Sequence, residues 1–412
     1  MNTWSLSWHG LTTVVGLEIR QRVRSRRWIW ALIAWFVFIG AVTALVLWSV
    51  YKIYRYDCNP LYDTCSIANS DAGPTAFAVI TMFILGMGLV IAPAFTATSI
   101  NGDRTQGTLA TLQATRLSSV EIAGGKLIAA WLSAAVFLLV ALPFIIVSMV
   151  LGNISVLQVV VCFAVIFVLV AVVCAIGLGW SSIVSRAAGS TLLTYLSVVV
   201  LGIISPLVLV LTLSFVQEDT QIQVWGLNSS ETTQYYDAVN AYWNNPKGKT
   251  APEPPVDQCH WFTRTQSVTR MDRVWWLLVP NPFVIVADAA PLSPQAHGDI
   301  TYAEDPLSMI RSGVREMARP PALEVDQCID LYASSPAYQV NYNTDGTVTI
   351  TKNGSIVTPP PSPVTPRPVA ENYPVWPYGL AVNLILGAIF FWITVHKLRI
   401  PYKTLTKGTR VA

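Results

Sequence analysis

The sequence predicts an all-α polytopic membrane domain of six transmembrane helices, with an α+β domain inserted before the last helix. The first observation is the composition. Hydrophobic residues make up 53% of the chain and charged residues only 12%, against roughly 25% charged residues in an ordinary soluble domain. The second is a set of uncharged apolar runs, because about 20 apolar residues suffice to cross the hydrocarbon core as a helix.

Six segments reach this length. The uncharged run 127–185 is long enough for two spans that turn at Gly152-Asn153. The first span follows basic residues, as a secretory signal does, but its apolar stretch of about 24 residues exceeds the roughly 7–15 of a signal-peptide core. We therefore expect a retained anchor. The predicted spans are residues 28–51, 75–99, 127–151, 155–180, 190–216 and 376–396.

The distribution of Lys and Arg predicts the orientation of these spans. With a cytoplasmic N-terminus, fourteen Lys and Arg residues fall in inside segments, whereas the short outside loops contain only Lys52 and Arg55. Both termini, including the basic tail 397–412, are then on the cytoplasmic side of the plasma membrane. The net charge of +3 is too small to indicate a nucleic-acid partner.

Residues 1–27 are expected to form an amphipathic helix on the inner membrane surface, because apolar residues recur every three or four positions. The alternative is a basic tail that serves only to orient the first span. The residues of the predicted apolar face are Trp4, Trp8, Leu11, Val15, Ile19 and Val23.

A polar segment of 26 residues, 101–126, separates the second and third spans. A simple turn needs only a few residues, so this length favours a short helix that contacts a partner outside the membrane. An apolar stripe near helical spacing and flanking glycines support this. The alternative is a solvated connector whose charges only fix the orientation.

Residues 217–375 are predicted to form the outer, extracellular domain. Alternation of apolar and polar residues predicts strands at 338–342, 347–351 and 355–357, separated by the hairpin-turn sequences Thr344-Asp345-Gly346 and Asn353-Gly354. A Pro-rich linker, 358–369, then leads back to the membrane. The apolar segment 275–287 is too short to cross and contains Pro280-Asn281-Pro282, so we expect a re-entrant or interfacial hairpin. A strand pair in the core of the outer domain is the alternative.

Four cysteines fall on the predicted outer side. They are most simply explained by two disulfides, Cys58–Cys65 and Cys259–Cys328, although a crossed pairing is possible. A metal site at Cys259, His260 and Cys328 is disfavoured, because it offers too few ligands at a recognisable spacing. We expect no metal site.

The predicted spans contain no Asp, Glu, Lys or Arg. Carriers driven by protons or sodium ions usually have ionisable side chains at mid-membrane, so this absence argues against such a carrier. The sequence also contains no phosphate loop. Gly248-Lys249-Thr250 lacks the first glycine, as Trp243 occupies that position, and Gly124-Gly125-Lys126 lacks both that glycine and the final Ser or Thr.

In this order of elements, the chain resembles the permease subunits of ATP-binding-cassette (ABC) exporters, the ABC-2 type whose fold is called ABCG-like or type V. The resemblance covers about residues 4–214 and 376–396. It departs from the family in the outer insertion of about 150 residues. The most specific motif residues are Asp103-Arg104, Gly107-Thr108-Leu109, Leu112, Thr115-Arg116-Leu117-Ser118, Glu121-Ile122 and Gly125-Lys126.

The resemblance implies that residues 101–126 contain the coupling helix, which contacts a cytoplasmic ABC ATPase. ATP and Mg would be bound by that separate subunit, so no cofactor is expected in this chain. A second permease, identical or different, and membrane lipids are the other implied partners. The implied ATPase-coupling residues are Asp103, Arg104, Thr108, Leu109, Leu112, Thr115, Arg116, Leu117, Ser118, Glu121 and Lys126.

The resemblance also implies a translocation path between the second and fifth spans of two subunits. Met and aromatic side chains there suit a hydrophobic or amphipathic cargo, such as a lipid, a peptide or a drug-like compound; plain helix packing is the alternative. The implied path residues are Met82, Phe83, Met87, Phe95, Thr194, Tyr195, Ser197 and Leu201.

The expected function is therefore ATP-driven export by a subunit that is not itself an enzyme. One alternative is a membrane scaffold or sensor that signals from its outer domain without transport. A membrane enzyme would require a cluster of acids or a metal site that the sequence does not display.

Overall fold

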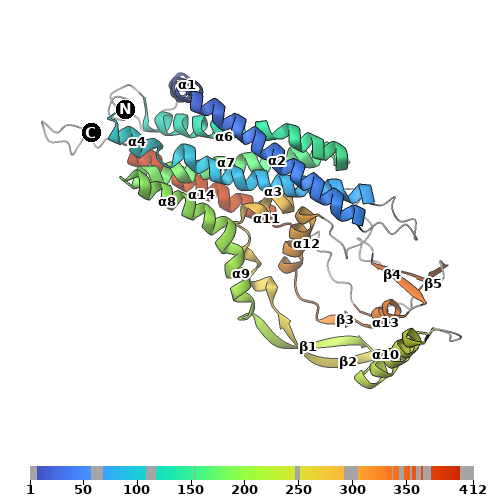
Figure 1. Cartoon of the computed structure of the whole chain (residues 1–412). Helices are drawn as coiled ribbons and strands as arrows, with labels where there is room; N and C mark the ends of the chain where they lie inside the picture. The colour runs from blue at the N-terminus through green and yellow to red at the C-terminus, as the bar shows by residue number, and fades with distance from the viewer. Residues whose placement is uncertain are drawn as a thin grey trace.

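The structure is a computed structural model in which long helices form a bundle and two small sheets lie beyond one end of it (Figure 1). It describes residues 7–56, 68–107, 117–152, 154–245, 251–291, 305–335, 337–342, 348–352, 355–358, 363–364 and 373–399. The predicted helices of the spans and the predicted small β region are both present.

Among the described residues, six helical segments are long and apolar enough to cross a membrane, in agreement with the six predicted spans. The fifth is built from three consecutive pieces. The helices are α2 (Arg26–Tyr56), α3 (Ala68–Thr96), α6 (Ser119–Gly152), α7 (Val156–Ile183), the series α8 (Ala187–Val199), η2 (Val200–Ile204) and α9 (Ser205–Leu213), and α14 (Trp376–Lys397).

The core of the bundle lies between α3, α6 and α7, and α14 packs along α7. Because α7 is apolar around its whole circumference, it can be buried on all sides. Indole N–H groups find backbone partners in this core: Trp35 donates to the Phe137 carbonyl at 2.9 Å and Trp131 to that of Phe167 at 2.9 Å. The α8–α9 segment is the least buried of the six.

Helix α1 (Trp8–Val23) packs across the beginning of α6. Gly10, Leu11 and Val14 form its buried face, and a Cβ on Gly125 would lie only 2.6 Å from the Val14 side chain, so the close approach requires glycine there. Of the predicted apolar face, Leu11 therefore contacts the protein, whereas Trp8 is 76% exposed.

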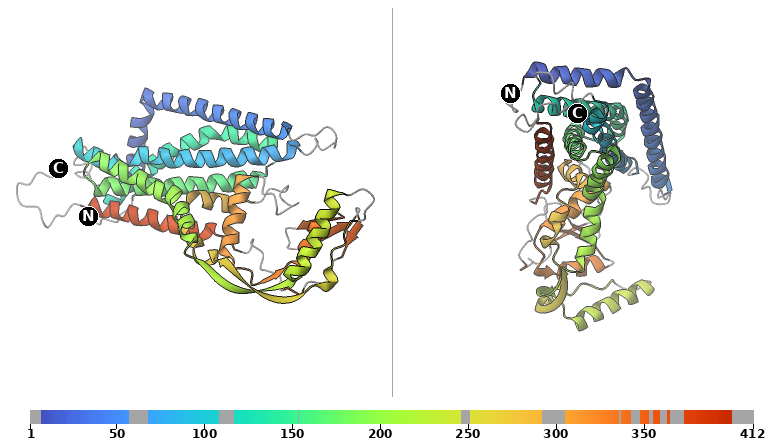
Figure 2. Two further views of the ribbon diagram at one scale, coloured as in Figure 1. Left: turned by 60° about the horizontal axis from the view of Figure 1, so that its bottom comes forward. Right: turned by 90° about the vertical axis from the view of Figure 1, so that its left-hand side faces the viewer.

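The first sheet is a long ribbon that continues the chain from α9. Strands β1 (Gln217–Gly226) and β2 (His260–Thr269) pair antiparallel along their whole length, and β3 (Glu324–Asp326) adds to β1 in parallel. The ribbon curves away from the helices, and α10 (Ser229–Asn244) lies at its far end (Figure 2). Sequence patterning did not predict this ribbon.

The second sheet is the predicted meander. Strands β4 (Tyr338–Tyr342), β5 (Val348–Lys352) and β6 (Ser355–Val357) pair antiparallel in that order. Helix α13 (Cys328–Ser334) precedes it and is joined to the start of β2 by the Cys259–Cys328 disulfide, with the Cα atoms 6.5 Å apart. Of the two predicted disulfides, this one is present, while Cys58 and Cys65 lie outside the described residues.

The predicted hairpin 275–287 is helical rather than a strand pair. A short turn, η5 (Trp275–Leu277), leads into α11 (Pro282–Ala289), which is almost wholly buried among α3, α7, η2 and α14. Helix α12 (Pro306–Ala318) packs against α11 and extends toward the first sheet.

Candidate functional site

A cluster of charged side chains lies where α1, α6 and α4 (Ser99–Thr105) meet. Lys126 is 2% exposed, and its Nζ is 2.6 Å from the Glu18 carboxylate and 2.6 Å from that of Asp103. A buried ammonium requires such partners, because removing it from water is costly. The three helices are therefore held together by one cation.

Arg22 extends this cluster toward the core. Its guanidinium donates to Ser133 Oγ at 3.0 Å, lies 3.8 Å from Glu18 and stacks 5.2 Å from the ring centre of Phe95. Burial lowers the pKa of Arg22, and the Glu18 carboxylate opposes that shift. The guanidinium stays protonated at physiological pH, so this contact is permanently charged.

Glu121 fixes the start of α6 to the start of α1. Its carboxylate accepts from the Ser7 amide at 2.6 Å and from the Ser118 amide at 2.7 Å, and Ser118 Oγ accepts from the Glu121 amide. The Ser118–Glu121 pair is a capping box, which satisfies amides that a helix start leaves unpaired. Glu121 is thus a brace between two helices.

The beginning of α4 is tied to the fourth and fifth spans. Ser181 Oγ accepts from the amides of Ile100 and Asn101 at 2.9 and 3.2 Å, and Asn101 Nδ2 donates to Ser190 Oγ at 2.7 Å. A displacement of α4 would therefore act directly on α7 and α8.

The predicted ATPase-coupling residues are only partly covered by the structure. Asp103, Ser118, Glu121 and Lys126 belong to the junction of α1, α4 and α6 and are engaged within the chain. Arg104 and Leu117 are half-buried at its border. The others lie outside the described residues: Thr108, Leu109, Leu112, Thr115 and Arg116.

Sequence reasoning missed Glu18 and Arg22 as members of this cluster. Glu18 carried a usable signal, since it is the only acidic residue among the basic residues 1–27. A lone acid on a basic helix indicates that its carboxylate is used in an ion pair, but not with which residue; here it pairs with Lys126 at 2.6 Å and lies 3.8 Å from Arg22.

Of the eight predicted path residues, Met82, Phe83, Met87 and Phe95 belong to α3, and the other four belong to α8 and η2. Phe83 and Phe95 pack against aromatic residues of α2, with ring centres 6.4 Å from Trp35 and 5.6 Å from Trp28, respectively. From α8, the Tyr195 hydroxyl donates to the Val90 carbonyl at 3.2 Å and so joins α8 to α3.

The remaining path residues pack within the chain. Met82 and Met87 are half-buried against the core, Thr194 is buried, Ser197 Oγ accepts from Trp180 Nε1 at 3.0 Å, and Leu201 lies in η2. These contacts fit helix packing as well as a path.

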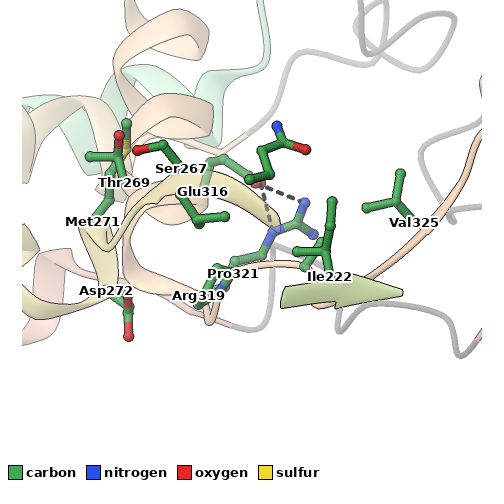
Figure 3. Close-up of a pocket in the computed structure, with 12 residues that line it drawn as sticks. Ile222, Ser267, Thr269, Met271, Asp272, Glu316, Arg319, Pro321 and Val325 are labelled. Atoms are coloured by element: carbon green, nitrogen blue, oxygen red, sulfur yellow. Dashed lines mark hydrogen bonds and ion pairs between the residues drawn. The ribbon is translucent and has the colours of Figure 1, made fainter. Parts of the chain in front are cut away.

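A separate hollow of about 430 Å³ lies between β1, β2 and the end of α12 (Figure 3). Its lining includes Ile222, Ser267, Val325 and an ion pair between Glu316 and Arg319 at 2.7 Å. No sequence motif pointed to it. Within the described residues, no group of three His, Cys, Asp or Glu side chains could hold a metal ion.

The six apolar helices, with their charged junction at one end, are those of a multi-pass membrane protein. The chain belongs to the ABC-2 family of transporter proteins, because the family model described as ABC-2 family transporter protein matches residues 12–245, more than half of its length. The match begins in α1 and ends just after α10. A comparison with curated proteins finds no match.

Membership in this family makes the chain a membrane permease of an ABC transporter. Permeases of this family are transport subunits that pair with an ABC ATPase and are generally not catalytic themselves.

Proposed function

We propose that this chain is the permease subunit of an ATP-driven exporter with the ABCG-like fold. Two permeases, identical or different, would assemble with two separate ATPases that bind ATP and Mg, and would move a hydrophobic or amphipathic compound outward across the plasma membrane. Residues 1–27, 101–126 and 397–412 are then cytoplasmic and residues 217–375 extracellular. Helix α1 then rests on the inner membrane surface.

The observation that carries this proposal is the buried Lys126 at the junction of α1, α4 and α6. The segment that would dock to the ATPase leaves from α4 and returns at α6, so both of its ends are fixed to this junction. Asn101 continues the connection to α8, in the fifth span. A force applied by the ATPase at this end can thus reach the helices that would enclose the path.

The junction residues act in this proposal by positioning the docking segment. Asp103, Ser118, Glu121 and Lys126 hold its two ends, whereas Arg104 and the residues between 108 and 117 contact the ATPase. This division of roles follows from burial, because a side chain as enclosed as Lys126 has little surface to offer a partner.

Charge reversal of Arg104 tests the proposal. The Arg104→Glu variant is expected to lose co-purified ATPase and ATP-dependent export of ethidium, an amphipathic probe, because a charged contact of the interface is inverted. Arg186→Glu is the matched control, since Arg186 is exposed at the start of α8 and lies outside the proposed docking segment. Export that is unchanged in Arg104→Glu would contradict the proposal.

A sensor is the second candidate, and the hollow between β1, β2 and α12 is the observation that favours it. Its volume of about 430 Å³ falls in the range of small-molecule sites. A sensor would bind a ligand there and alter the ATPase without moving any probe across the membrane.

A further inference from the structure

The fifth span contains a π-helical turn near its middle. Between α8 and α9, residues Val200–Ile204 form η2, and the Ser205 amide donates to the Val200 carbonyl, five residues earlier. A π turn contains one residue more than the α-helix around it and is often found at functional sites. Such a turn persists when its surroundings hold it.

The side chain that hydrogen-bonds to this turn belongs to Asn281, the N-cap residue of α11. Asn281, which is 3% exposed, donates through Nδ2 to the Gly202 carbonyl at 3.1 Å and to Ser205 Oγ at 3.0 Å. Its Oδ1 accepts from the Phe283 amide at 2.9 Å and so caps α11. One amide therefore joins the start of α11 to the π turn.

Phe283 fills the space beside this hydrogen bond. Its ring lies between two glycines, because a Cβ on Gly202 would be 3.3 Å from the ring and a Cβ on Gly86 of α3 would be 3.7 Å away. The first distance is tight and the second is an ordinary contact. The π turn is thus packed against an aromatic ring that only glycine can approach without displacement.

The sixth span, α14, contacts the same region around the start of α11. Asn383 of α14 donates to the Pro280 carbonyl at 3.0 Å, and Gly379 lies directly against Val279 and Ile285. The start of α11 is therefore bonded to α14 and to η2 at the same time. A relative movement of the fifth and sixth spans must break one of these two sets of contacts.

We infer that Asn281 and Phe283 form a latch that selects between two registers of the fifth span. This inference rests on the proposed function. When the latch is engaged, η2 keeps its extra residue. When it releases, the turn returns to α-helical geometry, which rotates α9 by about 100° relative to α8, since an α-helix has 3.6 residues per turn. Asn281 and Phe283 are positioning residues, which act on the path through η2.

Spin-label distances measure the register directly. Labels on unnatural amino acids at the exposed Leu192 and Leu211 report the relation of α8 to α9 in the full chain in lipid nanodiscs. Deletion of Leu201 removes the extra residue without rotating α9, so it supplies the reference for the engaged register in a span that is α-helical throughout. Asn281→Ser keeps an acceptor that can cap α11 but cannot reach Gly202. Its α9 should therefore rotate, so its distance should differ from those of the wild type and of the deletion.

Two alanine variants form the matched pair. Gly202→Ala crowds the Phe283 ring and should shift the Leu192–Leu211 distance, whereas Gly86→Ala should keep the wild-type distance. The double variant, Asn281→Ser with the Leu201 deletion, should equal the deletion alone, because the latch has nothing left to hold. A wild-type distance in Asn281→Ser, or an equal shift in Gly86→Ala, overturns the latch.

Transport supplies a second readout. In the complex with its ATPase, Asn281→Ser should lower ATP-driven export of ethidium about tenfold, the size of a typical allosteric coupling, while Gly86→Ala exports normally. Full export by Asn281→Ser overturns the inference. If the wild type itself shows no ATP-driven export, the proposed function fails, and the distances alone decide whether the latch exists.

Discussion

At the scale of single residues, a few buried polar side chains connect helices that are far apart in the sequence. Lys126 joins α1, α4 and α6, and Asn281 joins α11 to the π turn. Each of these side chains forms its ion pairs or hydrogen bonds with other residues of the same chain. In an apolar bundle such contacts are directional, whereas packing of aliphatic side chains specifies position less strictly.

Replacement of Lys126 should therefore be costly. Lys126→Met leaves two carboxylates facing each other, and breaking a buried ion pair costs roughly 3–5 kcal/mol; about 2–4 kcal/mol is expected here, because both carboxylates are partly exposed. The thermal midpoint of the full chain in detergent should fall by several degrees. In the triple variant with Glu18→Gln and Asp103→Asn, most of that loss should be recovered. No recovery would show that Lys126 acts through packing alone.

The meander is tied by a pH-sensitive carboxylate to the segment that follows α10 and precedes β2. Glu253 accepts from Lys352 and, at 2.5 Å, from the Tyr338 hydroxyl, and these bonds hold the pKa of Glu253 below its ordinary value of 4.5. A carboxyl with a lowered folded-state pKa stabilises the fold above its unfolded pKa. This stabilisation disappears as the pH falls through the lowered value.

Acidification below pH 4.5 should accordingly loosen β4 and β5 from the loop that contains Glu253. Hydrogen exchange of the amides in these strands, corrected for intrinsic rates, measures this. The Glu253→Gln variant should exchange faster at neutral pH and show little further change on acidification. An identical pH profile in wild type and variant would show that the Glu253 carboxylate does not cause the loosening of these strands.

At the scale of elements, α11 depends on its neighbours at both ends. At the C-terminal end of α11, the buried Asp288 pairs with Arg315 of α12 at 2.5 Å. Its carboxylate also accepts from the amides of Val375 and Trp376, at 2.7 Å each, where α14 begins. A carboxylate at a helix start is favourable, since it satisfies unpaired amides and the positive end of the helix dipole. Three elements thus share one carboxylate.

Asp288→Ala should destabilise this part of the chain by about 3–5 kcal/mol, because Arg315 would remain buried without its carboxylate. Thermal unfolding of the full chain measures the loss. The double variant Asp288→Ala with Arg315→Met removes the unpaired charge and should be more stable than the single variant. A double variant that is less stable than Asp288→Ala would contradict this explanation.

The sequence predicted elements that repeat a simple pattern and missed those that depend on a partner. The meander β4–β6 was confirmed because it alternates and carries short turn sequences. The β1–β2 ribbon was missed because its strands are mostly exposed and polar, so they show little alternation. The cationic partner of Glu18 could not be predicted, because 108 residues separate it from Lys126.

At the scale of the whole molecule, large apolar side chains cover the outside of the bundle. Trp30 of α2, Leu192 of α8 and Val210 of α9 are each at least 60% exposed. A soluble protein rarely exposes such a surface, whereas lipid tails or the spans of a second permease can cover it. The sheets extend from the end opposite to α1 (Figure 1).

Chemical labelling tests the proposed orientation. Gln221→Cys on β1 should react with a membrane-impermeant maleimide in intact cells, and Gln106→Cys after α4 only after permeabilisation; both positions are exposed. Replacement of Cys58 and Cys65 by Ser removes them as targets, and the described free cysteines, Cys162 and Cys174, are buried. Reaction of both sites from the same side would contradict the arrangement.

The sequence by itself determined that this protein consists of six apolar helices around a polar segment, because span length and charge distribution are local properties of the chain. Only the tertiary structure decided which helices meet at Lys126, how α11 packs against the fifth span and where that span has its π turn. Those features arise from contacts between residues that are far apart in the sequence, and a local sequence pattern does not show which distant residues will meet.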